Sequence, residues 1–184
     1  MIPTDELKEE HQGILFMLRI LDKVAARIES RIQVEIEHLS SIVEFLQVFA
    51  DRCHHGKEEE LLFPALEKSG IPKEGGPIGV MLKEHQEGRG FIRGMADALE
   101  KFKKGESRDL NDYARNARSY LALLTQHINK EDRVLFPMGE KVLSKEEQEK
   151  LLEGFEKIEA ERIGEGTHEK LHGLLEKLEK IYLK

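Results

Sequence analysis

An eleven-residue motif that occurs twice constrains the fold of this chain more than any other feature. The first copy spans residues 54–64, the second spans residues 127–137, and six of the eleven aligned positions are identical. The shared residues are His, Lys, Glu, Leu, Phe and Pro, in that order. A helix turns about 100° per residue, so a His and a Glu four positions apart lie on the same face. Each copy therefore predicts a helix that presents one imidazole and one carboxylate together.

Both His-Glu pairs belong to apolar stripes, which predicts that they face a helical core. A buried carboxylate without a partner costs several kcal/mol, so two such pairs require cations or dense hydrogen bonding as compensation. Metal ions would supply that compensation directly. The two stripes are Leu46, Ala50, His54, Glu58 and Leu62 in the first copy, and Leu123, His127, Glu131 and Leu135 in the second.

Apolar residues recur at spacings of three and four along most of the chain and predict four long helices. Thr4 is expected to cap the first helix. Pro64 should bend or end the second, and Pro137 with Gly139 should mark the end of the fourth. The four helices are expected at about 5–29, from Val34 to Ser69-Gly70, at 78–104 and at 108–138.

Long helices joined by short loops favour antiparallel neighbours, so we expect an all-α, up-down-up-down four-helix bundle over residues 1–143. Residues 144–184 are expected to add two C-terminal helices that pack on the bundle, capped by Ser144 and Thr167. The composition agrees, because 39% hydrophobic and 35% charged residues are typical of amphipathic helices with solvated outer faces.

His11 and His85 extend the predicted metal site to the two remaining helices. His11 continues an apolar stripe of the first helix, and His85 continues one of the third. Two imidazoles per metal and two bridging carboxylates would leave open coordination positions, which suits iron that accepts an oxo or hydroxo bridge and a small ligand. The predicted ligands of two Fe ions, with Zn or Mn as alternatives, are His11, His54, Glu58, His85, His127 and Glu131.

These residues resemble the hemerythrin, or HHE cation-binding, family over about residues 5–140. In that family, histidines on the first and third helices combine with a His-x-x-x-Glu pair on each of the second and fourth. The segment 76–85 looks like the third helix of the di-iron proteins that repair iron–sulfur centres. Oxygen-carrying hemerythrins often have a fifth histidine one turn before the third-helix ligand. Met81 stands there in this chain, so the resemblance implies a shell that is one ligand short.

Charge and composition exclude several classes of binding partner and of site. A net charge of −7 disfavours nucleic acid and anionic membrane surfaces. No apolar run approaches the length of a membrane span, and residues 1–6 lack the features of a signal peptide, so a cytoplasmic location is expected. The single cysteine, Cys53, excludes an intrachain disulfide or a thiolate-built metal site and is expected to pack as an apolar side chain.

Several other polar residues offer competing interpretations. His55 and Glu59 form a second His-x-x-x-Glu pair, but the repeat selects His54 and Glu58, since both registers of a regular helix cannot face one point. His38 is expected on the surface.

The segment His168-Glu169-Lys170-Leu171-His172 matches the His-Glu-x-x-His pattern of zinc proteases. It leaves a zinc hydrolase as a minor alternative, although short patterns of abundant residues arise by chance.

The sequence thus predicts a non-haem di-iron protein that binds or senses oxygen, nitric oxide or peroxide, or that handles iron. The apolar side chains of Leu62, Phe63, Leu135 and Phe136 would limit water near the site. We expect a binding protein, as a monomer or homodimer, rather than a dedicated enzyme. The enzymatic alternative is a di-iron oxidoreductase or an iron–sulfur-centre repair factor, because open positions on redox metals also permit turnover.

Overall fold

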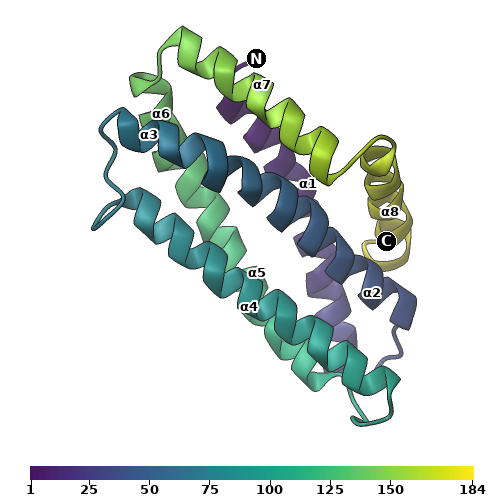
Figure 1. Ribbon diagram of the computed structural model, residues 1–184. Coiled ribbons are helices and arrows are strands. Elements are labelled where there is room, and N and C mark those ends of the chain that lie inside the picture. Colours follow the sequence, from purple (N-terminus) through teal and green to yellow (C-terminus); the bar gives the residue numbers. More distant parts are fainter.

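The computed structural model describes all 184 residues, and its regular structure is entirely helical (Figure 1). Four long helical segments form the bundle, and the second and fourth each contain π-helical stretches, labelled η. In chain order, the elements are α1 (Pro3–Glu29); α2 (Ile36–Phe45), η1 (Leu46–His55), η2 (Glu58–Leu62) and α3 (Phe63–Lys68); α4 (Pro77–Lys103); α5 (Asn111–Lys130), η3 (Glu131–Leu135) and α6 (Phe136–Val142); then α7 (Lys145–Arg162) and α8 (Thr167–Tyr182).

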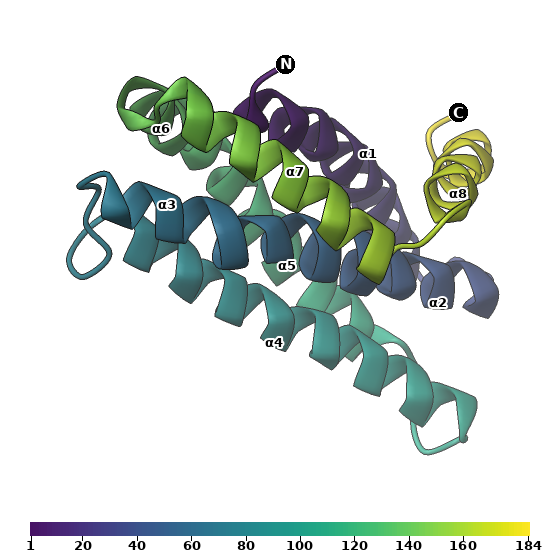
Figure 2. The same ribbon diagram turned by 45° about the horizontal axis from the view of Figure 1, so that its top comes forward.

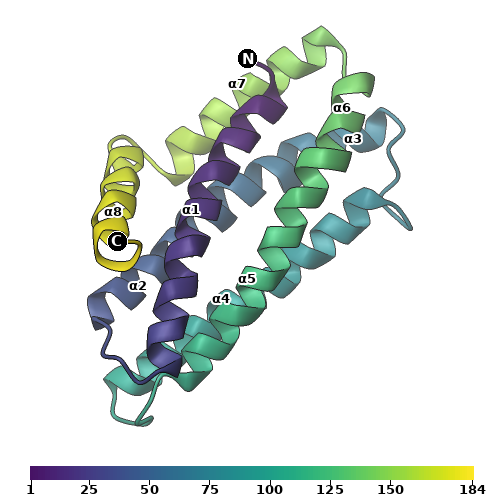
Figure 3. The ribbon, with the colours of Figure 1, turned by 180° about the vertical axis from the view of Figure 1, so that it is seen from behind.

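The four long segments run antiparallel, which confirms the predicted all-α, up-down-up-down bundle. Helix α1 packs against α5, α5 against α4, and α4 against α2 and η1, while η1 closes the ring by contacting α1. Figure 3 views the molecule from behind, and in this view α1 and α5 lie in front of the other two segments. Each segment thus presents one stripe to a shared interior.

Helices α7 and α8 lie outside the ring, on the side formed by α1 and the second segment (Figure 2). Helix α7 contacts α1, η1 and η2, and α8 contacts α1 and α2. Both bury apolar side chains against the bundle: Leu151, Phe155 and Ile158 from α7, and Leu171, Leu178 and Tyr182 from α8. The face formed by α4 and α5 lies on the opposite side of the molecule.

The prolines of the repeated motif lie inside their helices. For Pro64 this agrees with the predicted end of the second helix at Ser69-Gly70, whereas the predicted end of the fourth helix at Pro137 and Gly139 is wrong. The second segment passes Pro64 and continues to Lys68, and the fourth passes Pro137 and continues to Val142. In both, a π-helical stretch lies immediately before the Phe-Pro pair. Proline lacks an N–H and clashes with the carbonyl of the preceding turn, and a wider π turn there relieves both conflicts. Both motif copies therefore use the same backbone device.

The capping predictions had mixed outcomes. Ser144 caps α7 as expected, because its hydroxyl accepts a hydrogen bond from the backbone N–H of Glu147 at 3.2 Å. Thr4 is not a cap, since α1 already begins at Pro3. Thr167 is the first residue of α8, and Gly166 holds the cap position with φ of 80°, a left-handed conformation that glycine adopts without strain.

A polar layer divides the bundle interior into two apolar cores. The larger core contains Ile14, Leu46 and Leu124, and the smaller one contains Leu7, Leu62 and Leu135. His11 lies between Leu7 and Ile14 on α1 and belongs to neither. The layer between the cores is the place where the predicted ligands meet. No helix of the chain combines the length and the apolar character that a membrane crossing requires.

Candidate metal centre

The six side chains predicted as metal ligands all lie in this polar layer, and none is more than 1% exposed. Each helical segment contributes at least one of them, as the repeat and the apolar stripes implied. The contributors are α1 with His11, η1 and η2 with His54 and Glu58, α4 with His85, and α5 and η3 with His127 and Glu131.

Each carboxylate spans two groups of histidines. Glu58 Oε1 lies 3.4 Å from His54 Nε2, while its Oε2 lies 3.3 Å from His85 Nε2. Glu131 Oε2 lies 3.1 Å from His11 Nε2, while its Oε1 lies 3.1 Å from His127 Nε2. The two oxygens of each glutamate therefore point to different halves of the centre, which is the arrangement of a bridging carboxylate.

The buried donor atoms fit metal ions better than they fit one another. Both oxygens of Glu58 and of Glu131, together with Nε2 of His11 and of His54, are buried without a hydrogen-bond partner. His85 Nε2 and His127 Nε2 face each other at 3.1 Å. Unsatisfied buried carboxylates are costly, and nitrogen and oxygen donors of this kind bind divalent first-row metals. The residues present thus suit a pair of metal ions.

A carboxylate orients each of these four imidazoles from behind. The Nδ1 atom of His11 lies 2.7 Å from Asp132, that of His54 lies 2.6 Å from Glu10, that of His85 lies 3.2 Å from Glu59, and that of His127 lies 3.0 Å from Glu84. Such contacts fix the tautomer and direct Nε2 to the centre. The structure assigns Glu59 and Asp132, from the two motif copies, to this role.

The lysines shared by the two motif copies support two of these carboxylates. Lys57 donates to Glu10, the partner of His54, and Lys130 donates to Glu84, the partner of His127, at 2.5 Å. The motif therefore encodes a ligand histidine, a bridging glutamate and the lysine that holds the orienting carboxylate of that histidine. Sequence reasoning found the lysines in the repeat but gave them no function.

His55 is the residue that sequence reasoning missed. It is only 4% exposed, its ring stacks on His85 at a centroid distance of 3.8 Å, and its Nδ1 lies 3.3 Å from Asp51. A donor atom of His55 lies within 4.8 Å of donor atoms of Glu58, His85 and His127. A fifth histidine is thus present, although Met81 stands where the resemblance led us to expect it.

The backbone explains why His54 and His55 can both face the interior. Residues 46–55 are π-helical, and this looser winding changes the angular spacing of consecutive side chains from that of a regular α-helix. The argument that one register excludes the other assumed α-helical geometry and is wrong here. The sequence did contain a signal for this. The second motif copy has the apolar residue Ile128 at the position of His55, which indicates that this position faces the interior.

The two groups of donors differ in composition. Glu58 belongs to both groups, with His11, His54 and Glu131 in one and with His55, His85 and His127 in the other. Burial and the nearby His85 lower the pKa of His55 to about 3, so its imidazole is neutral and free to donate a lone pair. One half of the centre thus offers three imidazoles and the other offers two.

The pKa values of His54, His127 and Glu131 are strongly shifted in the absence of metal. Burial opposes protonation of His54, but Glu58 and Glu10 outweigh it and raise its pKa to about 10. Glu131 and Glu84 do the same for His127, whose pKa is also about 10. Burial and Glu58 favour protonation of Glu131, but His127 and His11 outweigh them and lower its pKa to about 2. Buried ion pairs thus balance the charge in the metal-free protein.

The Leu-Phe-Pro end of each motif copy covers the centre with apolar rings. Phe136 stacks on His11 with centroids 5.5 Å apart, and Phe63 stacks on His85 at 5.8 Å. Both phenylalanines, with Leu62 and Leu135, are at most 1% exposed. The site is therefore shielded from water on this side, as the sequence predicted.

The zinc-hydrolase pattern does not form a site. His168 and His172 are exposed on α8, where His168 Nε2 lies 3.1 Å from Glu159 and His172 Nε2 lies 3.2 Å from Glu176. Neither histidine belongs to a group of side chains that could hold a metal ion. The two histidines pair with different carboxylates, so the pattern carries no shared chemistry.

Two further expectations concern His38 and Cys53. His38 points away from the centre as expected, but it is buried rather than exposed, because α8 covers it and its Nδ1 lies 2.7 Å from the hydroxyl of Tyr182. Cys53 is fully buried in the larger apolar core, and burial raises its thiol pKa to about 12, which agrees with a packing role.

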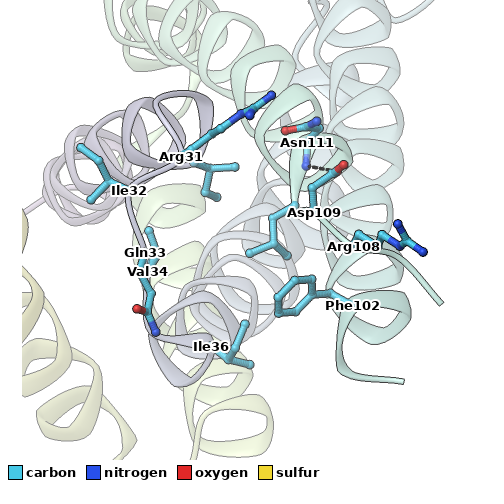
Figure 4. A pocket seen from close by; sticks show the side chains of 11 residues that line it. Arg31, Ile32, Gln33, Val34, Ile36, Phe102, Arg108, Asp109 and Asn111 are labelled. Atoms are coloured by element: carbon cyan, nitrogen blue, oxygen red, sulfur yellow. Dashed lines mark hydrogen bonds between the residues drawn. The ribbon is translucent and has the colours of Figure 1, made fainter. Parts of the chain in front are cut away.

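A solvent-open hollow of about 530 Å³ lies at the far end of the bundle (Figure 4). It is formed by the connections between α1 and α2 and between α4 and α5, and Phe102 and Ile36 line it beside Arg31 and Arg108. None of the candidate ligands lines this hollow. The centre is thus enclosed in the core rather than placed in this surface depression.

Comparison with known proteins agrees with this geometry. The model of the hemerythrin HHE cation-binding domain matches residues 2–139, and the chain belongs to this family. It is also 26% identical over 161 residues to an uncharacterized protein of Mycobacterium bovis and to uncharacterized proteins from two strains of Mycobacterium tuberculosis. The alignment covers 88% of this chain and 62% of each relative. A comparison with solved structures gave no significant match.

Membership of this family implies that the chain binds metal. The family match ends at residue 139, so it includes the whole polar layer and excludes α7 and α8. The curated relatives are longer than this chain, which spans about three fifths of their length.

Proposed function

We propose that this protein is a non-haem di-iron protein that binds a small ligand, such as oxygen, nitric oxide or peroxide, at a carboxylate-bridged pair of ions. His11 and His54 would hold one ion, His55, His85 and His127 the other, and Glu58 and Glu131 would bridge them. The proposal depends on one observation: both oxygens of both buried glutamates point to histidine nitrogens in two halves without hydrogen-bond partners.

The unequal halves support ligand binding at one particular ion. Three imidazoles and the bridges fill more coordination positions than two imidazoles and the bridges, so the half with His11 and His54 retains more room. Bound iron would supply redox chemistry and open coordination positions for a diatomic ligand. The protein's own part is to orient the imidazoles through Asp132, Glu10, Glu59, Glu84 and Asp51 and to exclude water with Phe63 and Phe136.

Metal content and an optical spectrum of anaerobically purified protein test the proposal. We expect two Fe ions per chain and a spectral change on adding oxygen or nitric oxide. Glu58→Ala and Glu131→Ala should each lose both ions, because each glutamate spans both halves. Glu67→Ala is the matched control, since Glu67 is exposed on the same segment nine residues after Glu58. Wild-type protein that binds no stoichiometric iron, or glutamate variants that retain both ions, would contradict the proposal.

A further inference from the structure

Glu159 on α7 lies at the outer end of a chain of polar contacts that leads to His54. Its Oε1 accepts a hydrogen bond from Lys57 Nζ at 3.0 Å, and Lys57 also donates to Glu10. Glu10 in turn holds His54 Nδ1 at 2.6 Å. The three inner residues belong to the segment that matches the family, whereas Glu159 lies outside it. The C-terminal helices thus reach the surroundings of the candidate metal centre.

Lys57 is the central member of this chain and is fully buried. An ammonium group has three N–H donors, and Lys57 directs them to three carboxylates: Glu6 at 2.8 Å, Glu10 and Glu159. Its charge lies among the oxygens of Glu10 and Glu159, so a lysine already fills the place where these two groups and Cys53 could otherwise gather a cation. Loss of Glu159 would leave one buried N–H without its partner.

Glu159 is held firmly where it meets Lys57. Phe155, one turn earlier on α7, is fully buried, and the Lys57 ammonium lies 5.5 Å from its ring centroid. Arg162, less than one turn later, donates to the backbone carbonyl of Arg52 at 3.0 Å and to Glu60 at 2.6 Å. Helix α7 is therefore anchored against η1 and η2 on both sides of Glu159.

In the opposite half of the centre the outer support comes from the bundle itself, because Arg89 of α4 donates to Asp51 and to Glu59, the carboxylates behind His55 and His85. Lys130 occupies the position of Lys57 in the second motif copy, but its side chain is 41% exposed and it pairs with Glu84 alone. Helices α7 and α8 pack on the other side of the bundle. An effect that depends on Glu159 should therefore be confined to the half that contains His54.

We propose that Glu159 is a positioning residue that fixes the His54 imidazole through Lys57 and Glu10 and so strengthens metal binding at the half formed by His11 and His54. This inference rests on the proposed di-metal function. It assigns to α7, which lies beyond the family match, a part in setting the affinity for the ion held by His11 and His54.

The test is a Fe²⁺ titration of the full-length metal-free protein under anaerobic conditions, with a chelator as competitor. For Glu159→Gln we expect one of the two binding steps to weaken by about tenfold, the lower end of the range for residues that orient ligands, with the other step unchanged. Glu156→Gln is the matched control, because Glu156 is exposed one turn earlier on α7. Thermal unfolding of each metal-free variant shows whether the fold has changed.

The outcomes separate this inference from the function on which it rests. Wild-type protein that fails to bind two Fe²⁺ ions overturns the di-metal proposal. Two normal binding steps in Glu159→Gln overturn only the positioning role.

Combination with Lys130→Met provides an independent check on selectivity. That variant should weaken the other binding step, and the double variant should show both losses without further change, since Glu159 and Lys130 have no contact partner in common. Loss of the same step in both single variants would overturn the assignment of Glu159 to one half.

Discussion

The two halves of the bundle contain nearly the same motif but surround it differently. In each, a lysine supports a glutamate, that glutamate orients a histidine, and a phenylalanine stacks on the histidine of a neighbouring helix. In the first half the lysine, Lys57, is fully buried among three carboxylates and covered by α7, whereas in the second half Lys130 is 41% exposed. The same residues therefore have different energetic consequences in two places of one molecule.

The halves also differ in the number of histidines. His55 comes from the first motif copy, but it adds a third imidazole to the half of the metal centre that contains His85 and His127. Its counterpart in the second copy is the buried Ile128. A strictly symmetric repeat would give two equal metal positions. One extra histidine and one extra helix instead make the two positions unequal, because one gains a third imidazole and the other is reached by a contact from α7.

The largest expected effect comes from removing the charge of Lys57, and the same change at Lys130 provides the comparison. Lys57→Met leaves three carboxylates facing one another without their cation, and breaking such a buried network costs about 3–5 kcal/mol in free energy of unfolding. Lys130→Met removes a partly exposed ion pair and should cost less than about 1 kcal/mol. Urea denaturation of the metal-free proteins measures both values. Equal losses would contradict the view that α7 makes the halves different.

Next in size is the effect of replacing His55 by the residue of the other copy. His55→Ile removes a donor that faces the centre, so one of the two Fe²⁺ ions should bind about 100-fold more weakly, the upper end of the range for the ligand-orienting partners. The matched control is Ile128→Val, which keeps an apolar side chain at the equivalent position. Full retention of both ions by His55→Ile would show that the fifth histidine is not a ligand.

The raised pKa values of His54 and His127 predict an opposite pH dependence with and without metal. Both pKa values rise on folding from 6.5 to about 10, so the resulting stabilisation is complete below 6.5 and is lost as pH rises towards 10. Metal-free protein should therefore melt at lower temperature as pH rises through this window. Fe²⁺ affinity should rise over the same window, because ligation requires these imidazoles without their Nε2 protons. A metal-free protein whose melting temperature is constant would contradict the ion pairs.

The smallest effect is expected at the exposed end of the contact chain. His168→Ala removes a half-exposed partner of Glu159, which should change the free energy of unfolding by less than about 1 kcal/mol. Glu169→Gln, at an exposed position beside it, should leave metal content unchanged. Elemental analysis and thermal unfolding check both variants. Loss of bound metal in either one would favour a site at the His-Glu-x-x-His pattern.

Much of the fold and of the candidate site was predictable because both follow from helical periodicity. Apolar spacing located the long helices, and a four-residue separation placed His54 with Glu58 and His127 with Glu131 on shared faces. The convergence of the six residues needed only the further assumption that all four apolar stripes face one core. Their role as ligands stays a prediction until metal binding is measured.

Local backbone departures from the regular helix were not predictable in the same way. The π-helical stretch that ends at His55 turns two consecutive histidines inward, and similar stretches let Pro64 and Pro137 remain inside their helices. An argument that assumes 3.6 residues per turn wrongly excludes His55 from the interior, and the fourth helix was wrongly expected to end at Pro137 and Gly139. These errors cluster around the candidate site, where the backbone departs most from regular geometry.

By itself the sequence determined the class of fold, the donor types and the pairing of one histidine with one glutamate in each motif copy. These features depend on residues within a turn or two of each other, where helix geometry fixes the relation. Only the tertiary structure decided which carboxylate orients each histidine and that Glu159 from α7 contacts Lys57. Those partners come from different helices, and their contacts depend on how whole helices pack rather than on any spacing along the chain.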